Sequence, residues 1–142
     1  MTGIIITGHG KFADGIKSVI KLVVGKEKGI EYVDFTEDKS TGDLKNDLEA
    51  AVKKLECEDY LFFTDLAGGS PFKKAVEISL EGTNAEVIAG TNIPMLMEIL
   101  FKVDILSLEE LKNKAIETGR KQIVNFEMKT KAKDTSDSTT GI

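Results

Sequence analysis

The chain has 142 residues, 30% of them charged and 41% hydrophobic, which is the balance of one soluble domain with its own core. Its 19 basic and 24 acidic residues give a net charge of −5, which argues against nucleic acid or an anionic membrane as partner. Cys57 is the single cysteine, no apolar run approaches the roughly 18 residues of a membrane span, and no basic signal region precedes the first strand, so the sequence indicates a cytoplasmic protein.

In the first half of the chain, continuous apolar runs typical of strands alternate with apolar residues at helical spacing. Residues 3–7 read as a buried strand that ends in Gly8-His9-Gly10, and a helix follows with its apolar stripe at helical spacing from Phe12. A second strand is predicted over 30–35, and Ser40 is expected to cap the next helix. The third strand, 60–64, is continuous in apolar character, as a central parallel strand should be.

The second half continues the alternation. Ser70, followed by Pro71, predicts a helix with a hydroxyl cap and a proline at its first position. A strand at 85–89, a short helix at 93–101 and a helix capped by Ser107 and Glu110 follow. Residues 122–128 alternate like an edge strand, and residues 129–142 have the composition of a disordered polar tail. We therefore expect a doubly wound α/β domain over 1–128, with a mainly parallel four-stranded sheet in the order 2-1-3-4 and a C-terminal edge strand.

The loop after the first strand allows two interpretations. Residues 8–13 fit the dinucleotide pattern G-x-G-x-x-A, and Asp34 ends the second strand about where a ribose-binding acid belongs. A small nucleotide-binding module is therefore one hypothesis. The fingerprint is weak, because glycine is common where a strand turns into a helix, and a full two-half dinucleotide fold needs a longer chain.

The loop after the third strand favours another chemistry. In the order 2-1-3-4 the first and third strands are neighbours, so their carboxyl ends bring His9 and Asp65 into one crevice. A carboxylate on Nδ1 would leave Nε2 as the nucleophile. The backbone N–H groups of Gly68, Gly69 and Ser70, at the start of a helix, could hold a phosphate. These residues predict a phosphoryl-transfer site that requires no metal and no cofactor.

Three segments in this order resemble the mannose-family EIIA component of the bacterial sugar phosphotransferase system. They are residues 4–10 (IIITGHG), 65–72 (DLAGGSPF) and 86–96 (EVIAGTNIPML), and the resemblance covers about residues 2–128. It implies a phosphotransferase in which His9 accepts phosphate from phospho-HPr and passes it to an EIIB component. It also implies that Asp65 orients the histidine and that Ser70 and nearby amides contact the phosphoryl group.

The resemblance further implies a homodimer in which the final strand is exchanged between subunits. Contact with the membrane components EIIC and EIID would be indirect, at the periphery of the permease. One departure concerns residues 66 and 67, which are Leu and Ala here and often Thr-Trp in the family, so a hydroxyl contribution from that position is lacking. A phosphorylation-state sensor would need the same histidine, so it stays an alternative to a relay. The transported sugar is not readable from the sequence, because EIIA contacts phosphoproteins and not sugar.

Overall fold

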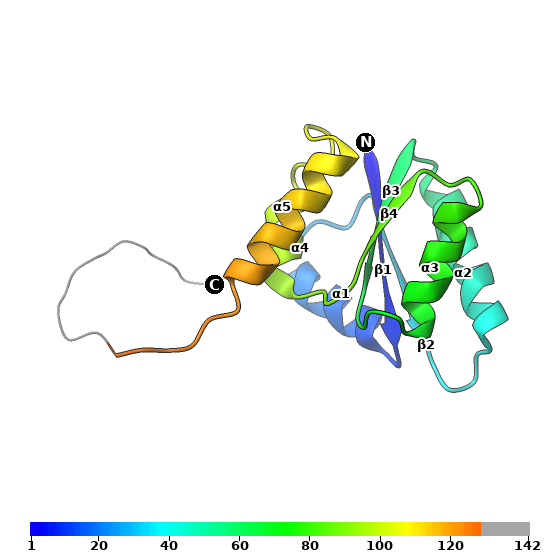
Figure 1. Ribbon diagram of the computed structural model, residues 1–142, viewed down its shortest axis with the longest axis horizontal. Coiled ribbons are helices and arrows are strands. Elements are labelled where there is room, and N and C mark those ends of the chain that lie inside the picture. The colour runs from blue at the N-terminus through cyan, green and yellow to red at the C-terminus, as the bar shows by residue number, and fades with distance from the viewer. Residues whose placement is uncertain (129–142) are drawn as a thin grey trace.

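The computed structural model describes residues 1–128, which form a sheet flanked by helices on both faces (Figure 1). The strands are β1 (Thr2–His9), β2 (Ile30–Phe35), β3 (Asp59–Thr64) and β4 (Ala85–Ile88). The helices are α1 (Phe12–Val23), α2 (Thr41–Leu55), α3 (Ser70–Leu80), α4 (Ile93–Ile99) and α5 (Leu108–Lys121). Strands and helices alternate as far as β4, as the sequence predicted.

All strand pairs are parallel, and the order across the sheet is β2-β1-β3-β4, which confirms the predicted order. In the register of the two central strands, Thr7 lies opposite Thr64. On the other side of β1, His9 lies opposite Phe35. The carboxyl ends of β1, β2 and β3 therefore meet at one edge of the sheet.

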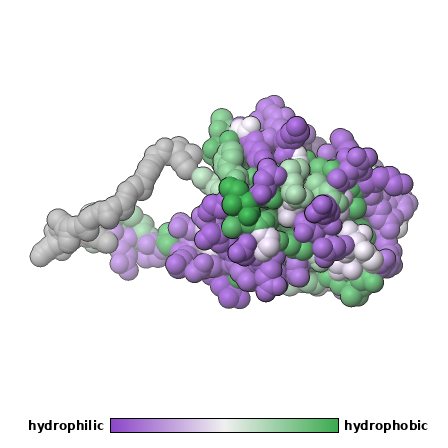
Figure 2. Space-filling view, turned by 90° about the horizontal axis from the view of Figure 1, so that it is seen from above, coloured by the Kyte–Doolittle hydropathy of each residue, from purple (hydrophilic) through white to green (hydrophobic). Residues whose placement is uncertain are grey.

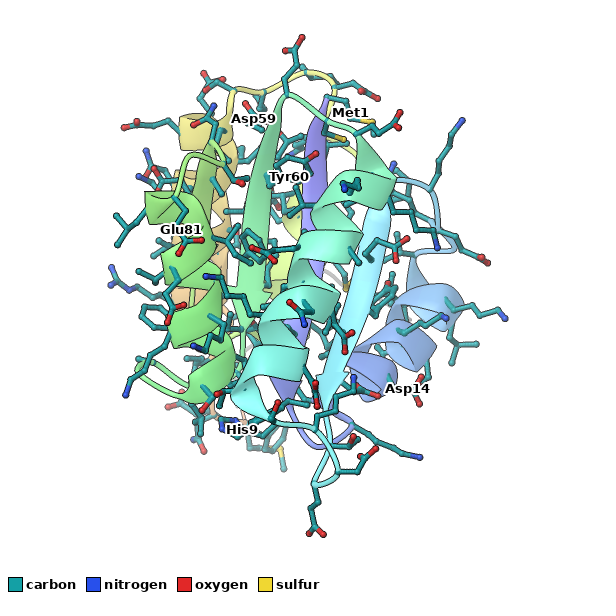
Figure 3. The ribbon with its side chains drawn as sticks, turned by 90° about the vertical axis from the view of Figure 1, so that its right-hand side faces the viewer. Met1, His9, Asp14, Asp59, Tyr60 and Glu81 are labelled. Carbon is teal, nitrogen blue, oxygen red and sulfur yellow. The ribbon has the colours of Figure 1, made fainter. Side chains whose placement is uncertain are left out.

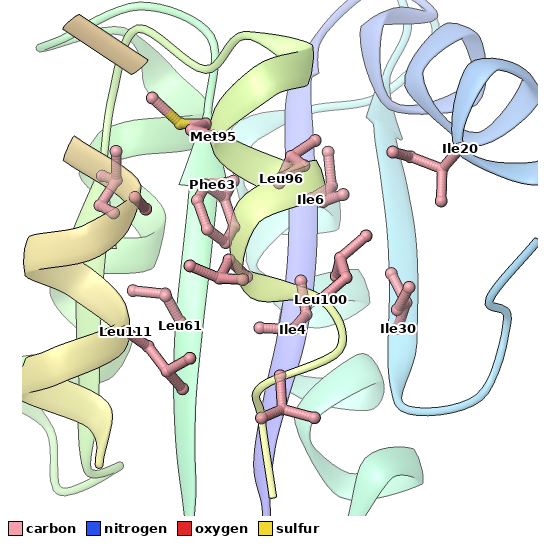
Figure 4. Packing of buried hydrophobic residues seen from close by; sticks show 14 of the residues in the cluster. Ile4, Ile6, Ile20, Ile30, Leu61, Phe63, Met95, Leu96, Leu100 and Leu111 are labelled. Atoms are coloured by element: carbon pink, nitrogen blue, oxygen red, sulfur yellow. The ribbon is translucent and has the colours of Figure 1, made fainter. Parts of the chain in front are cut away.

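The strand alternation divides the core into two layers. Side chains that point to one face, such as Ile4, Ile6 and Phe63, pack with α1, α4 and α5 (Figure 4). Ile5 and Phe62 point to the other face and pack with α2 and α3. Because successive side chains of a strand point to opposite faces, a strand covered by helices on both sides must be apolar throughout. The uninterrupted Ile4–Ile6 run reflects that requirement.

Two predicted helix starts are confirmed as capping boxes. Ser40 accepts a hydrogen bond from the backbone of Asp43, whose carboxylate bonds back to the Ser40 amide. Ser107 and Glu110 make the same reciprocal pair at the start of α5. Each pair satisfies two backbone donors that the first turn of a helix leaves open.

Residues 122–128, expected to form an edge strand exchanged between subunits, form no strand within the single chain. These residues follow α5 as an extended segment without strand pairing, and Ile123, Val124, Phe126 and Met128 are each at least 77% exposed. Alternating apolar residues identify a segment that can pair with a sheet, but they do not say which sheet edge receives it. The polar tail predicted at 129–142 lies outside the described residues.

No helix in the described part of the chain is long and apolar enough to cross a membrane. Seen from the end at which β1 begins, the surface is mainly hydrophilic, with hydrophobic residues exposed in its middle (Figure 2).

Candidate functional site

The site is built from the ends of the two central strands. His9 is the last residue of β1, and Asp65 directly follows β3, whose last residue Thr64 lies beside Thr7. Figure 3 shows His9 at the end of the molecule opposite Met1. The topology thus brings together two residues that are 56 positions apart in the sequence.

The Asp65 carboxylate accepts three hydrogen bonds. Its Oδ2 accepts from the backbone N–H of His9 at 2.9 Å and contacts His9 Nδ1 at 2.8 Å. Its Oδ1 accepts from the backbone N–H of Leu66 at 2.8 Å. Burial alone would raise the pKa of this carboxyl, but the hydrogen bonds from His9 and Leu66 hold it below its ordinary value.

The ionised carboxylate determines which ring nitrogen carries the proton. Because a carboxylate can only accept, Nδ1 of His9 must be the donor in their 2.8 Å contact. In the neutral imidazole, Nε2 then carries the lone pair. The Asp65 side chain is 13% exposed and the His9 side chain 43% exposed, so the acid is covered while the ring remains accessible.

Two further groups fix the ring. Phe35 lies 6.0 Å away, centroid to centroid, with an interplanar angle of 57°. On the side of Nε2, Gly69 comes so close that an added Cβ would lie 2.7 Å from His9 Cε1 and 3.4 Å from Nε2. The start of α3 therefore lies against the ring edge that would carry a phosphoryl group.

The predicted capping role of Ser70 is wrong. The N-cap of α3 is Gly69, which makes no side-chain cap, and Ser70 is already the first helical residue, with Pro71 following. Glycine serves at this position because a larger residue would meet the imidazole, and an extended glycine is an acceptable N-cap. Ser70 keeps its hydroxyl free of hydrogen bonds to the described residues.

The three amides predicted to hold a phosphate are not equivalent. The N–H of Gly69 donates to the carbonyl of Leu66 at 3.2 Å, so it is already used within the turn. Within residues 1–128, the N–H groups of Gly68 and Ser70 have no partner. Gly68 has φ +79°, a conformation that favours glycine, and this turn leads the chain from Asp65 into α3.

The geometry disfavours the nucleotide-binding interpretation of the first loop. Gly8 lies against the Phe12 ring, where an added Cβ would come within 2.5 Å of Cδ2, so its lack of a side chain serves packing. Asp34 accepts a hydrogen bond from the backbone N–H of Asp14 at 3.0 Å. This acid therefore caps the first turn of α1, where the hypothesis required it to bind ribose.

Sequence reasoning missed two features of the site. The Phe35 contact follows from the β1–β2 register, and the predicted strand order contained the signal for it. Thr7 is fully buried, and its Oγ1 has no hydrogen-bond partner among the described residues. Because its side chain is on the same face of β1 as that of His9, this hydroxyl lies beneath the site, and no sequence pattern marks it.

The chain is similar to known proteins over most of its length. The family described as "PTS system fructose IIA component" (EIIA-man) matches residues 3–116. The mannose-specific EIIAB component of Escherichia coli K12 is 35% identical over 122 residues, which are 84% of this chain and 38% of that protein. The fructose-specific EIIA component of Bacillus subtilis is 31% identical over 80% of this chain and 78% of its own length. The chain thus spans less than half of the EIIAB relative and most of the EIIA relative.

Solved structures show the same fold. The phosphotransferase system component EIIA of Streptococcus agalactiae superposes with a TM-score of 0.82 at 31% identity, covering 88% of this chain and 97% of that one. A mannose/sorbose-specific IIA subunit of Enterococcus faecalis gives a TM-score of 0.81 at 21% identity, with 92% and 98% covered, and supports the fold alone. The sequence match and the shared fold agree with the resemblance in the three segments, and the chain belongs to the mannose-type EIIA family of sugar phosphotransferase system components.

Proposed function

We propose that this chain is a phosphoryl carrier, with His9 as the residue that accepts the phosphate and hands it on. The observation that carries the proposal is the 2.8 Å contact between His9 Nδ1 and an ionised Asp65, which leaves Nε2 as an exposed nucleophile. The donor would be phospho-HPr and the acceptor an EIIB component, as in the family.

The transfer requires little covalent work from the protein. The Nε2 lone pair attacks the phosphorus, and the bond between phosphorus and the donor breaks with its electron pair going to the donor. No proton has to leave Nε2, because the Nδ1–H remains bonded to Asp65 throughout. Catalysis then consists of positioning the ring and stabilising the charge on the transferred group.

The start of α3 supplies that charge stabilisation. The N–H groups of Gly68 and Ser70, which have no partner among the described residues, flank Gly69, and Gly69 lies against the His9 ring near Nε2. A helix of 11 residues adds a positive partial charge at this end. The phosphorylated ring therefore gains hydrogen bonds that the free ring lacks.

Phosphate labelling tests the proposal. The full chain is incubated with phosphoenolpyruvate, Enzyme I and HPr, and we expect one acid-labile phosphate per chain. His9→Gln, which keeps the volume of the side chain, should take up none while melting at the wild-type temperature. Label that persists in this folded variant would contradict the assignment, since His9 is the only histidine.

Onward transfer tests the relay role. Purified phosphorylated chain should lose its label to an EIIB protein, and a chain that serves only as a sensor would retain it.

The proposal includes a cytoplasmic location, which is supported by the single cysteine, Cys57, present as a free thiol.

We also propose that the chain is a homodimer in which residues 122–128 pair with a second copy. Two observations support this part. The segment exposes four large apolar side chains, and no strand within residues 1–128 pairs with the outer edge of β4. A groove of about 260 Å³ lies between β4 and the helices beside it, lined by Val87, Ala89, Met95, Ile116, Gly119 and Ile123 among others.

Light scattering on the full chain tests the dimer. We expect a dimer for the wild type and a monomer for Val124→Asp/Phe126→Asp, because buried charge would prevent pairing. Leu22→Asp is the matched control, since Leu22 is 86% exposed on α1, far along the chain from the segment. A wild-type monomer, or a double variant that remains dimeric, would contradict strand exchange.

A further inference from the structure

A second cavity, of about 300 Å³, lies between the second half of α1 and the edge strand β2. Its lining combines four lysines, two glutamates and two apolar or aromatic residues: Lys17, Lys21, Lys26, Lys54, Glu27, Glu31, Ile30 and Tyr32. The cavity is separate from the phosphoryl site, because Ile30 and Tyr32 pair with Ile4 and Ile6 in the first part of β1, whereas His9 ends that strand. Three to five residues of strand separate these positions from His9 by about 10 to 16 Å.

The charge in this cavity is positive although the chain as a whole is acidic. Lys54 is paired with Glu31 at 3.4 Å. Among the described residues, Lys17, Lys21 and Lys26 make no ion pair. Four ammonium groups therefore face two carboxylates in a protein whose net charge is −5.

Tyr32 gives the cavity an aromatic wall and one more donor. Lys17 Nζ lies 5.8 Å from the centre of the Tyr32 ring. Burial, and after it the charge of Glu27, raises the pKa of Tyr32 to about 12. The hydroxyl is protonated at neutral pH, as in any tyrosine, and can donate a hydrogen bond. No hydrogen bond of this hydroxyl to the described residues is present.

We propose that this cavity binds a small organic phosphate, with Lys17, Lys21 and Lys26 around the phosphate group and the body of the ligand against Tyr32. Lysine binds phosphate as a point charge, and a phosphate monoester offers several acceptor oxygens to a site that consists of donors. The volume is at the lower end of the range for small-molecule sites, which fits a ligand of the size of a phosphorylated sugar.

Lysines beside an edge strand also prevent pairing with other sheets. Protection of the β2 edge requires only the positive charge of the lysines, and it does not involve the cavity or the Tyr32 hydroxyl. Ligand binding is therefore the measurement that distinguishes the two roles.

The test is a titration of the ¹⁵N-labelled full chain with glucose 6-phosphate, followed by amide chemical shifts. We expect saturable shifts at Lys17, Lys21 and Tyr32, and at least tenfold weaker binding in Lys17→Gln/Lys21→Gln. Glucose alone should leave these amides unchanged, whereas inorganic phosphate should shift them more weakly. Lys11→Gln/Lys73→Gln is the matched control, because it removes two lysines that do not line the cavity and should leave the affinity unchanged.

Three results would overturn the proposal: no saturable shift, shifts centred on His9 and Ser70, or equal affinity in the Lys17→Gln/Lys21→Gln variant. None of them bears on phosphoryl transfer by His9, which is measured separately by labelling.

Discussion

The close approach of Gly69 to the imidazole makes a specific prediction for Gly69→Ala. The new Cβ would lie 2.7 Å from His9 Cε1, which is closer than real Cβ atoms come to a neighbour. To reach an ordinary carbon–carbon separation of about 3.5 Å, the ring has to move by about 0.8 Å. The ring cannot move freely, because its Nδ1 is hydrogen-bonded to Asp65.

The backbone itself tolerates the substitution. Gly69 has φ −76° and ψ 170°, an extended conformation that alanine adopts without strain. Alanine is a poorer N-cap than glycine, which destabilises the folded protein by up to about 1 kcal/mol. Alanine also lowers the conformational entropy of the unfolded chain, which stabilises the folded protein by a similar amount. We therefore expect a near-unchanged free energy of unfolding, with the cost of the substitution confined to the position of His9.

The expected result is a transfer rate lower by about 10- to 100-fold, because a displacement of about 1 Å can cost a factor of 100. The assay is the initial rate of labelling from phospho-HPr, together with the melting temperature. Gly15→Ala is the control: it is the same change at the fourth residue of α1, where the new Cβ meets no atom within 4 Å, so the rate should be unchanged and the protein up to about 1 kcal/mol more stable. A wild-type rate in Gly69→Ala would refute the reasoning.

Three further predictions concern Asp65, Thr7 and Asp34. The hydrogen bonds that hold the Asp65 pKa below 3.8 contribute stability above the unfolded pKa of about 3.9, and this is lost as the pH falls through the folded value. Acid titrations of unfolding should therefore show a steeper loss below about pH 4 in the wild type than in Asp65→Asn. Thr7→Val removes a hydroxyl that has no partner among the described residues, so chemical denaturation should give equal or up to about 1 kcal/mol higher stability, and a loss would reveal a missed hydrogen bond. Asp34→Ala removes the acceptor for Asp14 N–H and should cost about 1 kcal/mol in thermal unfolding, whereas Asp34→Asn keeps an acceptor and most of the stability.

The sequence predicted the elements up to α5 because they depend on local signals, and the sheet order followed from the doubly wound topology that alternating strands and helices favour. The period of the apolar residues separated helices from strands, and Ser40 and Ser107 marked two helix starts that the structure confirms. The carboxyl ends of neighbouring parallel strands lie at one edge, so the approach of His9 and Asp65 followed from the order alone.

The role of a residue that depends on which particular side chain or backbone group it meets could not be predicted in this way. Ser70 looked like a cap because serine before proline is typical of a helix start, yet the imidazole requires a glycine at the capping position. Asp34 looked like a ribose-binding acid, yet its position beside α1 makes it a cap for that helix. In both cases a residue type was recognised correctly, and its partner, which the sequence does not show, decided its role.

The displacement of Ser70 from the cap has a consequence for the site. A capping serine would accept a hydrogen bond from the first turn of α3 with its hydroxyl. Its N–H would lie outside the helix and would not belong to the free donors of the first turn. As the first helical residue, Ser70 instead follows directly after Gly69, which lies against the His9 ring, and its N–H has no partner among the described residues. Gly69 has two roles: its lack of a side chain lets the His9 ring come close, and it occupies the N-cap position of α3 in place of Ser70. The helix start is therefore less well capped than α2 or α5, and the donors left open by this are those that we propose for a phosphoryl group on His9.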